Sequence, residues 1–350
     1  MISRLGRLIA DTRSLSLAGM CKNAGKTTVF NCMIRELNQT ELVLGLTSIG
    51  RDGEATDIVT GTHKPGIYVQ EGTIIGTAAG LLQYCDITKE IVGKSGIQTP
   101  MGEVILIRAR SDGFVQLAGP SMNSQLIELS SQFKELGVDK VMIDGAISRK
   151  SLCSTKVAES VILSTGASLH KSMDEVVRET QYVATILDLP AVDLNLSIEI
   201  QNPDPMKMNV VQLYDSRKEM IQLHPSDSGV FQLHELLRHK SYHHWKYCYL
   251  TGALTDVRLK PLLMSNLNIE DRQIVVEDSS KILLSRDCYN KMIKKGCSLA
   301  VSEETKLLGI TINPFSAYGH HFQKDEFMEK MQCAVRQPVW NVLEEEQWRD

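Results

Sequence analysis

The first half of the chain alternates short apolar runs with segments whose apolar residues recur at helical spacing. Apolar runs of strand length lie at 15–18, 42–47, 141–146 and 160–166. Apolar residues repeat every three or four positions at 29–37, 121–136 and 172–187, which predicts amphipathic helices. Strands that are apolar throughout and joined by helices predict a doubly wound, mostly parallel α/β sheet.

Between these elements the pattern is more mixed. Residues 67–69 are predicted as a strand, and the small and apolar residues of 72–84 as a helix. Residues 102–108 and 114–118 have the composition of successive strands around a Ser-Asp-Gly turn. The polar stretch 55–65 is long for a connection inside a compact domain, and we expect either a loop that closes over a ligand or an ordinary surface loop.

The pattern changes after residue 190. Short strand-like pieces at 194–198 and 210–213 flank an Asn-Pro-Asp-Pro sequence, which predicts a connector over 191–229. Strand and helix patterns then return, with strands at 247–250, 274–276, 299–301 and 308–312 and helices at 280–295 and 325–334. Because 350 residues exceed one compact core, we predict a nucleotide-binding domain at 1–190 and a smaller C-terminal α/β domain at 230–350.

Composition narrows the function classes. With 43% hydrophobic and 23% charged residues the chain has the composition of a soluble globular protein. The net charge of −4 gives no basic surplus for a nucleic-acid partner, and no apolar stretch approaches the length of a membrane span. The eight cysteines form no Cys-x-x-Cys pair, so we expect reduced thiols and a cytoplasmic protein.

The chemistry concentrates after the first apolar run, in the sequence Gly-Met-Cys-Lys-Asn-Ala-Gly-Lys-Thr-Thr at 19–28. A strand, a tight loop and a helix form the context that a phosphate-binding P-loop needs. Gly25 lets the backbone approach phosphate, Lys26 would reach the β- and γ-phosphates, and the Thr27 hydroxyl would bind Mg²⁺. The predicted nucleotide-binding residues are Gly19, Lys22, Asn23, Ala24, Gly25, Lys26, Thr27 and Thr28.

This loop is one residue longer than the standard motif, whose first glycine would fall at Met20 rather than Gly19. In that respect it resembles the dethiobiotin synthetase and cobyrinate amidase branch of P-loop proteins. The resemblance implies an acidic residue close to Mg²⁺ in the loop after the 42–47 strand, where Asp52 is the first candidate and Glu54 the second. A polar glycine-rich turn is the alternative interpretation. No Asn-Lys-x-Asp sequence is present to recognise guanine, which favours ATP over GTP.

Asp144 follows the three apolar residues 141–143 and is itself followed by glycine, as in a Walker B strand. Its carboxylate would hold Mg²⁺ opposite Thr27. The predicted catalytic residues are therefore Lys26, Asp52 and Asp144, and the predicted Mg²⁺ ligands are Thr27, Asp144 and Asp52.

Weaker candidates lie elsewhere. Thr251–Ala253 and Glu277–Ser280 follow predicted strands, where open α/β sheets bind ligands, although ordinary turns and N-caps explain them equally well. His243-His244 and His320-His321 are adjacent pairs without chelating spacing. The aromatic, glycine- and proline-rich segment 313–322 suggests contact with a partner or closure of a cleft, or else a packed corner.

Residues 17–28, 47–54, 143–146 and 313–322 together resemble the KamB family, which is associated with lysine 5,6-aminomutase. The resemblance implies an ATP-driven reactivase subunit that acts with a second, larger subunit to exchange damaged cobalamin in an adenosylcobalamin-dependent aminomutase. The competing hypothesis is a biosynthetic enzyme of the dethiobiotin synthetase type that activates a carboxylate, with Arg51, Lys64 and Arg149 as candidate substrate cations. A third is a nucleotide-binding scaffold without hydrolysis.

Overall fold

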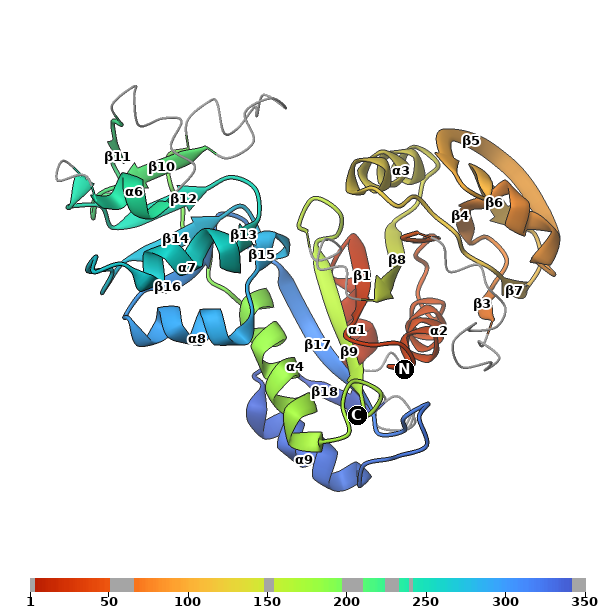
Figure 1. The fold of residues 1–350 in the computed structure, drawn as a ribbon. Coiled ribbons are helices and arrows are strands. Elements are labelled where there is room, and N and C mark those ends of the chain that lie inside the picture. The colour runs from red at the N-terminus through yellow and green to blue at the C-terminus, as the bar shows by residue number, and fades with distance from the viewer. Residues whose placement is uncertain are drawn as a thin grey trace. The chain divides into compact units, whose positions relative to one another are not determined.

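The computed structural model describes residues 4–50, 66–147, 154–196, 210–223, 233–238 and 242–341, and shows an α/β protein (Figure 1). The chain forms two compact units. Unit 1 comprises Met1–Ala184 and Lys306–Asp350, and unit 2 comprises Thr185–Thr305. Among the described residues, no helix is both long and apolar enough to span a lipid bilayer.

A nine-stranded sheet forms the centre of unit 1, in the order β18-β17-β9-β1-β8-β2-β4-β6-β5. The strands from β18 to β4 are parallel, and β6 and β5 continue the sheet antiparallel. Their bounds are β1 Ser14–Gly19, β2 Leu44–Ser48, β4 Ile74–Ala78, β5 Lys89–Thr99, β6 Gly102–Ala109, β8 Lys140–Ile147, β9 Ser160–Gly166, β17 Lys306–Asn313 and β18 Val339–Asn341. The predicted mostly parallel α/β sheet is thus confirmed.

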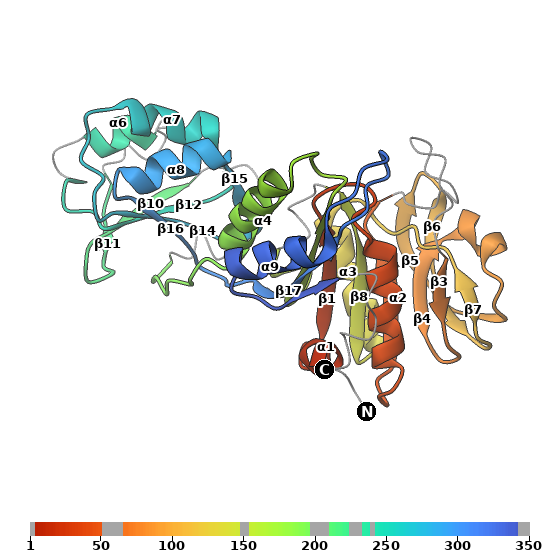
Figure 2. The same cartoon turned by 90° about the horizontal axis from the view of Figure 1, so that it is seen from below.

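Helices cover both faces of this sheet because alternate side chains of a strand point to opposite sides. On one face, helices α1 (Arg4–Ala10) and α2 (Lys26–Leu37) pack with the small sheet of β3 (Ile67–Val69) and β7 (Gly113–Val115). Helix α3 (Asn123–Glu135) covers the other face (Figure 2). In β8, Met142 belongs to the first cluster, whereas Val141 and Ile143 belong to the second.

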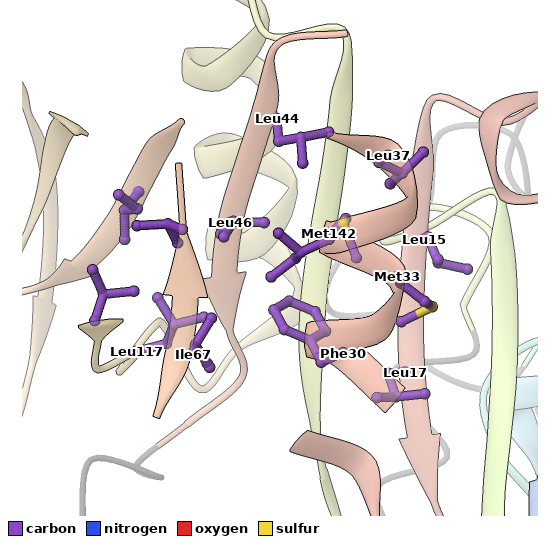
Figure 3. Close-up of a cluster of buried hydrophobic side chains, with 14 of the residues drawn as sticks. Leu15, Leu17, Phe30, Met33, Leu37, Leu44, Leu46, Ile67, Leu117 and Met142 are labelled. Atoms are coloured by element: carbon purple, nitrogen blue, oxygen red, sulfur yellow. The ribbon is translucent and has the colours of Figure 1, made fainter. Parts of the chain in front are cut away.

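The apolar stripe of α2 fixes this helix against the sheet. Phe30, Met33 and Leu37 are buried and point toward the strands, where they meet leucines of β1 and β2 and Met142 of β8 (Figure 3). Burying one such side chain contributes roughly 1.5–3 kcal/mol. The start of α2 is therefore held firmly at the carboxyl end of β1.

Among the described residues, the other helices of unit 1 are α4 (Met173–Leu187), α9 (Lys324–Ala334) and the 3-10 helix η1 (Ala79–Tyr84). An ion pair of 2.7 Å joins Lys330 of α9 to Asp174 of α4. The Gln181 amide also donates to the Ala334 carbonyl over 2.9 Å. The two helices are therefore linked at two points, although residues 188–323 separate them in the chain.

Unit 2 has its own five-stranded sheet in the order β11-β10-β12-β14-β16, in which β12, β14 and β16 are parallel. The strands are β10 Val211–Tyr214, β11 Met220–Ile221, β12 Tyr247–Leu250, β14 Gln273–Val276 and β16 Ser298–Val301. Helices α6 (Leu233–Arg238), α7 (Asp256–Met264) and α8 (Arg286–Lys294), the pair β13 (Leu254–Thr255) and β15 (Ile282–Leu283), and the 3-10 helix η4 (Ser279–Lys281) complete its described elements.

This division corrects the predicted domain boundaries. Residues 306–341 do not belong to a C-terminal domain 230–350, because β17 pairs with β9 in the large sheet and β18 pairs with β17. Strand β10 belongs to the sheet of unit 2, so 191–229 is more than a connector. Trp340 packs directly over Gly309, where an added Cβ would lie 2.0 Å from the indole ring. The strands of the two sheets are equally apolar. The sequence pattern alone therefore does not show that β16 belongs to unit 2 and β17 to unit 1.

Three predicted elements are also corrected. Residues 72–84 form β4 and η1 instead of one helix, and β4 is buried at every position as a central strand. The 280–295 helix begins only at Arg286, because the Ser285 hydroxyl accepts the Cys288 N–H and caps it. Residues 194–196 lie in no strand, and 197–198 fall outside the described residues.

Candidate functional site

The loop between β1 and α2, residues 20–25, contains two residues with positive φ angles. Asn23 (φ 58°) and Gly25 (φ 84°) are both left-handed. Left-handed residues within a tight loop turn successive N–H groups toward one point, and such concavities bind anions. Helix α2 begins directly afterwards at Lys26, so the positive end of its dipole faces the same point.

Gly19 makes room for the Lys26 side chain. A Cβ at position 19 would lie 2.7 Å from Cδ and 2.8 Å from Nζ of Lys26, closer than van der Waals contact allows. The lysine therefore folds back over the end of β1, beside the loop. This close approach is the physical reason for glycine at position 19 in a loop that carries Met20 where the standard motif has glycine.

Asp144 lies at the same edge of the sheet. Strand β8 is the direct neighbour of β1, with Leu17 aligned to Asp144, and on its other side β2 aligns Ser48 with Asp144. The Ile49 N–H donates to the Asp144 carbonyl over 3.0 Å, so the chain after β2 is fixed to this residue. The side chain of Asp144 is half-buried. Parallel strands bring their carboxyl ends together, so Lys26, Thr27 and Asp144 share one edge.

The other predicted acidic and basic residues cannot be placed. Asp52 and Glu54, and the candidate cations Arg51, Lys64 and Arg149, all fall outside the described residues. Among the predicted nucleotide-binding residues, Gly19, Lys22, Asn23, Ala24, Gly25, Lys26, Thr27 and Thr28 are all described, at the end of β1 or in the loop and first turn of α2.

A residue not among the predicted site residues anchors the loop. Asn313, the last residue of β17, donates its side-chain N–H to the Asn23 carbonyl over 2.9 Å. Its Oδ1 accepts the Phe315 N–H at 3.0 Å, and its own carbonyl accepts the Ala167 N–H at 2.9 Å. The only local signal was an Asn-Pro step after an apolar strand, because the contact depends on β17 lying two strands from β1.

The segment after Asn313 presents exposed aromatic rings. Phe315 and Tyr318 are 56% and 61% exposed, and the Phe315 ring stacks on His321 with centroids 6.1 Å apart. The neighbouring His320 ring instead contacts the Ala167 carbonyl at 2.8 Å. The two histidines thus turn to different partners, as adjacent residues do in an extended segment.

Cys21 lies inside the loop but is not poised as a nucleophile. Burial raises the pKa of its thiol to about 11, and the nearby Lys26 charge offsets this only in part. The thiol is therefore protonated at neutral pH, and its role in the loop is packing.

The strand ends of unit 2 use their polar groups internally. The buried Asp278 carboxylate accepts the backbone N–H of Ser280 at 2.9 Å and its hydroxyl at 2.5 Å. Ser279 bonds to Thr305 at 3.0 Å. The Arg258 guanidinium donates to the Thr251 carbonyl at 2.9 Å. These contacts are those of turns and helix caps. They agree with the alternative interpretation of Thr251–Ala253 and Glu277–Ser280 as ordinary structural turns.

Comparisons with known proteins add no further constraint. No protein-family model matches the chain, and no similar curated protein or solved structure was found. The function proposed below is therefore inferred from the geometry of the β1–α2 loop and the strand ends around it.

Proposed function

We propose that unit 1 binds Mg²⁺–ATP at the β1–α2 loop and hydrolyses it. The observation that carries this proposal is the combination of two left-handed residues, Asn23 and Gly25, with Lys26 at the start of α2 and Asp144 in the adjacent strand, level with the end of β2. Backbone N–H groups, a helix N-terminus and a lysine together supply the positive field that a triphosphate requires.

Each residue has a distinct role in this proposal. Lys26 stabilises charge on the β- and γ-phosphates as it shifts during cleavage. The Thr27 hydroxyl and the Asp144 carboxylate are hard oxygen donors, the kind that Mg²⁺ prefers, and bound Mg²⁺ would neutralise phosphate charge. Asp52 remains our candidate for orienting the attacking water. Asn313 holds the Asn23 carbonyl and so keeps the loop in its anion-binding conformation.

Phe315 supports a place for the base. Its exposed ring lies two residues beyond Asn313, whose side chain contacts the loop, so a purine bound through its phosphates could stack on it. Such stacking contributes about 1–3 kcal/mol per base in other nucleotide-binding proteins.

The test is nucleotide binding and turnover by the purified full chain. We expect Mg²⁺-dependent ATP hydrolysis that falls roughly 100- to 1000-fold in Lys26→Ala, Asp144→Asn and Asp52→Asn. Lys134→Ala, an exposed lysine of α3, is the matched control and should retain full activity. Absence of both binding and turnover in the wild type would refute the proposal, and binding without turnover would favour a scaffold.

We propose further that this ATP turnover drives reactivation of an adenosylcobalamin-dependent aminomutase of the lysine 5,6-aminomutase type. Support comes from the KamB resemblance together with one geometrical fact. Three of its segments, 17–28, 143–146 and 313–322, meet at one sheet edge, through the β1–β8 pairing and the Asn313–Asn23 hydrogen bond. Residues that carry the resemblance therefore belong to one site.

Reactivation is tested with mutase inactivated by a cobalamin that lacks the adenosyl group. We expect mutase activity to return when the chain, its second subunit, adenosylcobalamin and Mg²⁺–ATP are all added, and not with Lys26→Ala. ATP turnover stimulated by a small carboxylic acid but indifferent to the mutase would instead favour a biosynthetic enzyme of the dethiobiotin synthetase type.

A further inference from the structure

The small sheet of β3 and β7 carries an exposed pair of aromatic rings. Tyr68 and Phe114 are aligned partners across the two strands, with centroids 5.3 Å apart and planes at 71°. They are 41% and 49% exposed. Phe114 also lies over Gly66, where an added Cβ would come within 2.8 Å of its ring. The pair is therefore a fixed surface feature and not two independently moving side chains.

Carboxylates surround these rings. The Tyr68 hydroxyl donates to Asp112 at 3.3 Å, and the other oxygen of Asp112 accepts the Glu71 N–H at 2.9 Å. Asp86 accepts the Phe114 N–H. Partial burial, and next the charge of Asp112, raise the pKa of the Tyr68 phenol, so its ring stays neutral. We call Tyr68, Phe114, Glu71, Asp86 and Asp112 the aromatic–acidic patch.

Among the described residues, no basic side chain pairs with the two aspartates of this patch, Asp86 and Asp112. Two basic side chains of the adjoining β5–β6 region turn to other acceptors, since Arg110 pairs with Glu90 and Lys89 donates to the Cys85 carbonyl. The patch thus presents π faces and anionic oxygens together.

We propose that the aromatic–acidic patch binds a lysine- or arginine-bearing segment of a partner protein. The negative faces of aromatic rings attract cations, and the long apolar stems of lysine and arginine cover ring surface while their charged ends reach nearby carboxylates. The carboxylates of the patch repel an acidic segment, and an uncharged segment would gain only contacts with the aromatic rings. Charge complementarity therefore selects the cationic partner.

The patch is attached to the helix of the proposed nucleotide site. Asn31 of α2 donates to the Gly66 carbonyl at 2.9 Å and accepts the Tyr68 N–H at 3.0 Å, pairing with β3 as a neighbouring strand would. Residue 31 lies just over one turn after Lys26. A partner on the patch therefore contacts an element fixed to the start of α2, but its binding does not depend on the proposed ATP hydrolysis.

The test uses a fluorescent arginine-glycine-serine peptide and the same peptide with glutamate in place of arginine, without nucleotide and at physiological salt. We expect the cationic peptide to bind the full chain and the acidic one not to. Asp86→Asn with Asp112→Asn removes both charges, keeps one acceptor oxygen at each position, and should weaken binding about tenfold. Tyr68→Ala with Phe114→Ala should weaken it by a similar factor.

The matched control removes one carboxylate and one exposed apolar side chain elsewhere, Glu304→Gln with Met264→Ala, and should bind like the wild type. Equal loss in the control, equal binding of both peptides, or no binding of the cationic peptide overturns the proposal. So does self-association of the wild type that the patch variants abolish, because the occupant is then a second copy. Thermal melting verifies that each variant is folded.

Discussion

The two units place polar residues at the carboxyl ends of parallel strands in opposite ways. In unit 1 the chain after β1 takes two left-handed residues and delivers Lys26 and a helix N-terminus to the sheet edge. In unit 2 the chain after β14 folds the Asp278 carboxylate back onto Ser280, and Ser279 onto Thr305. Topology is similar at both edges, so the direction of the polar groups distinguishes a candidate site from a structural turn.

Of the substitutions that test this difference between the two units, Gly19→Ala should have the largest effect on ATP turnover. The new methyl group occupies the space of the Lys26 side-chain end. Because that end is flexible, it can move away at little cost in stability, but it then no longer reaches phosphate. We expect ATP turnover to fall about 100-fold with the melting temperature nearly unchanged. Retained turnover would show that the folded-back lysine is unimportant.

Asp278→Ala and Asp144→Asn should have opposite phenotypes. Removing the buried Asp278 carboxylate leaves the Ser280 N–H without its cap and should lower the free energy of unfolding by about 1–2 kcal/mol, with ATP turnover intact. Asp144→Asn should lower turnover about 100-fold with a smaller change in stability. Chemical denaturation gives the stability of both variants, and an ATPase assay gives their turnover. Equal changes in both variants would contradict the proposed difference between the two sheet edges.

Asn313→Asp tests the anchor of the β1–α2 loop. Aspartate keeps the oxygen that accepts the Phe315 N–H but cannot donate to the Asn23 carbonyl. We expect the ATP dissociation constant to rise roughly fivefold to tenfold, as for loss of one hydrogen bond. Titration calorimetry measures it, with Asn313→Gln as the control that restores a donor. An unchanged affinity would mean that the loop holds its shape without Asn313.

The smallest effect concerns the opposite, amino-terminal end of β8. Lys140 is buried there against the Ile9 and Thr12 carbonyls and the Thr12 hydroxyl, and desolvation lowers its pKa to about 8. In the unfolded chain the pKa of Lys140 is near 10.5. Between pH 8 and 10.5 the unfolded chain therefore binds more protons than the folded one, and the free energy of unfolding rises with pH. We expect a gain of about 1 kcal/mol between pH 7.5 and 9.

Lys140→Met removes that titration, so its stability should rise less over the same interval. Urea denaturation of both proteins at several pH values gives the difference directly, because all other groups titrate alike in the two chains. A parallel pH dependence would show that Lys140 keeps an ordinary pKa despite its burial.

Sequence pattern was sufficient where structure is local. The β1–loop–α2 unit, β8 and α3 follow from apolar spacing within a few turns of chain. Asn313 could not be identified as an anchor because its contact with Asn23 requires β17 to join the sheet beside β9. β4 was missed because its short run of β-branched residues, Ile74, Ile75 and Thr77, was joined to the small and apolar residues of η1 in one predicted helix. Asp52, one of the three predicted catalytic residues, lies outside the described residues.

The insertion of unit 2 between α4 and β17 has a consequence for biosynthesis. A ribosome releases the chain from its amino end, so the β1–α2 loop emerges early, while its anchor Asn313 emerges only after all of Thr185–Thr305. Until then β9 has an unpaired edge, which is a template for wrong strand pairing. The β1–α2 loop is thus translated early but gains its anchor late. Unit 2 can fold before the large sheet, whose strands precede and follow it in the chain, is complete.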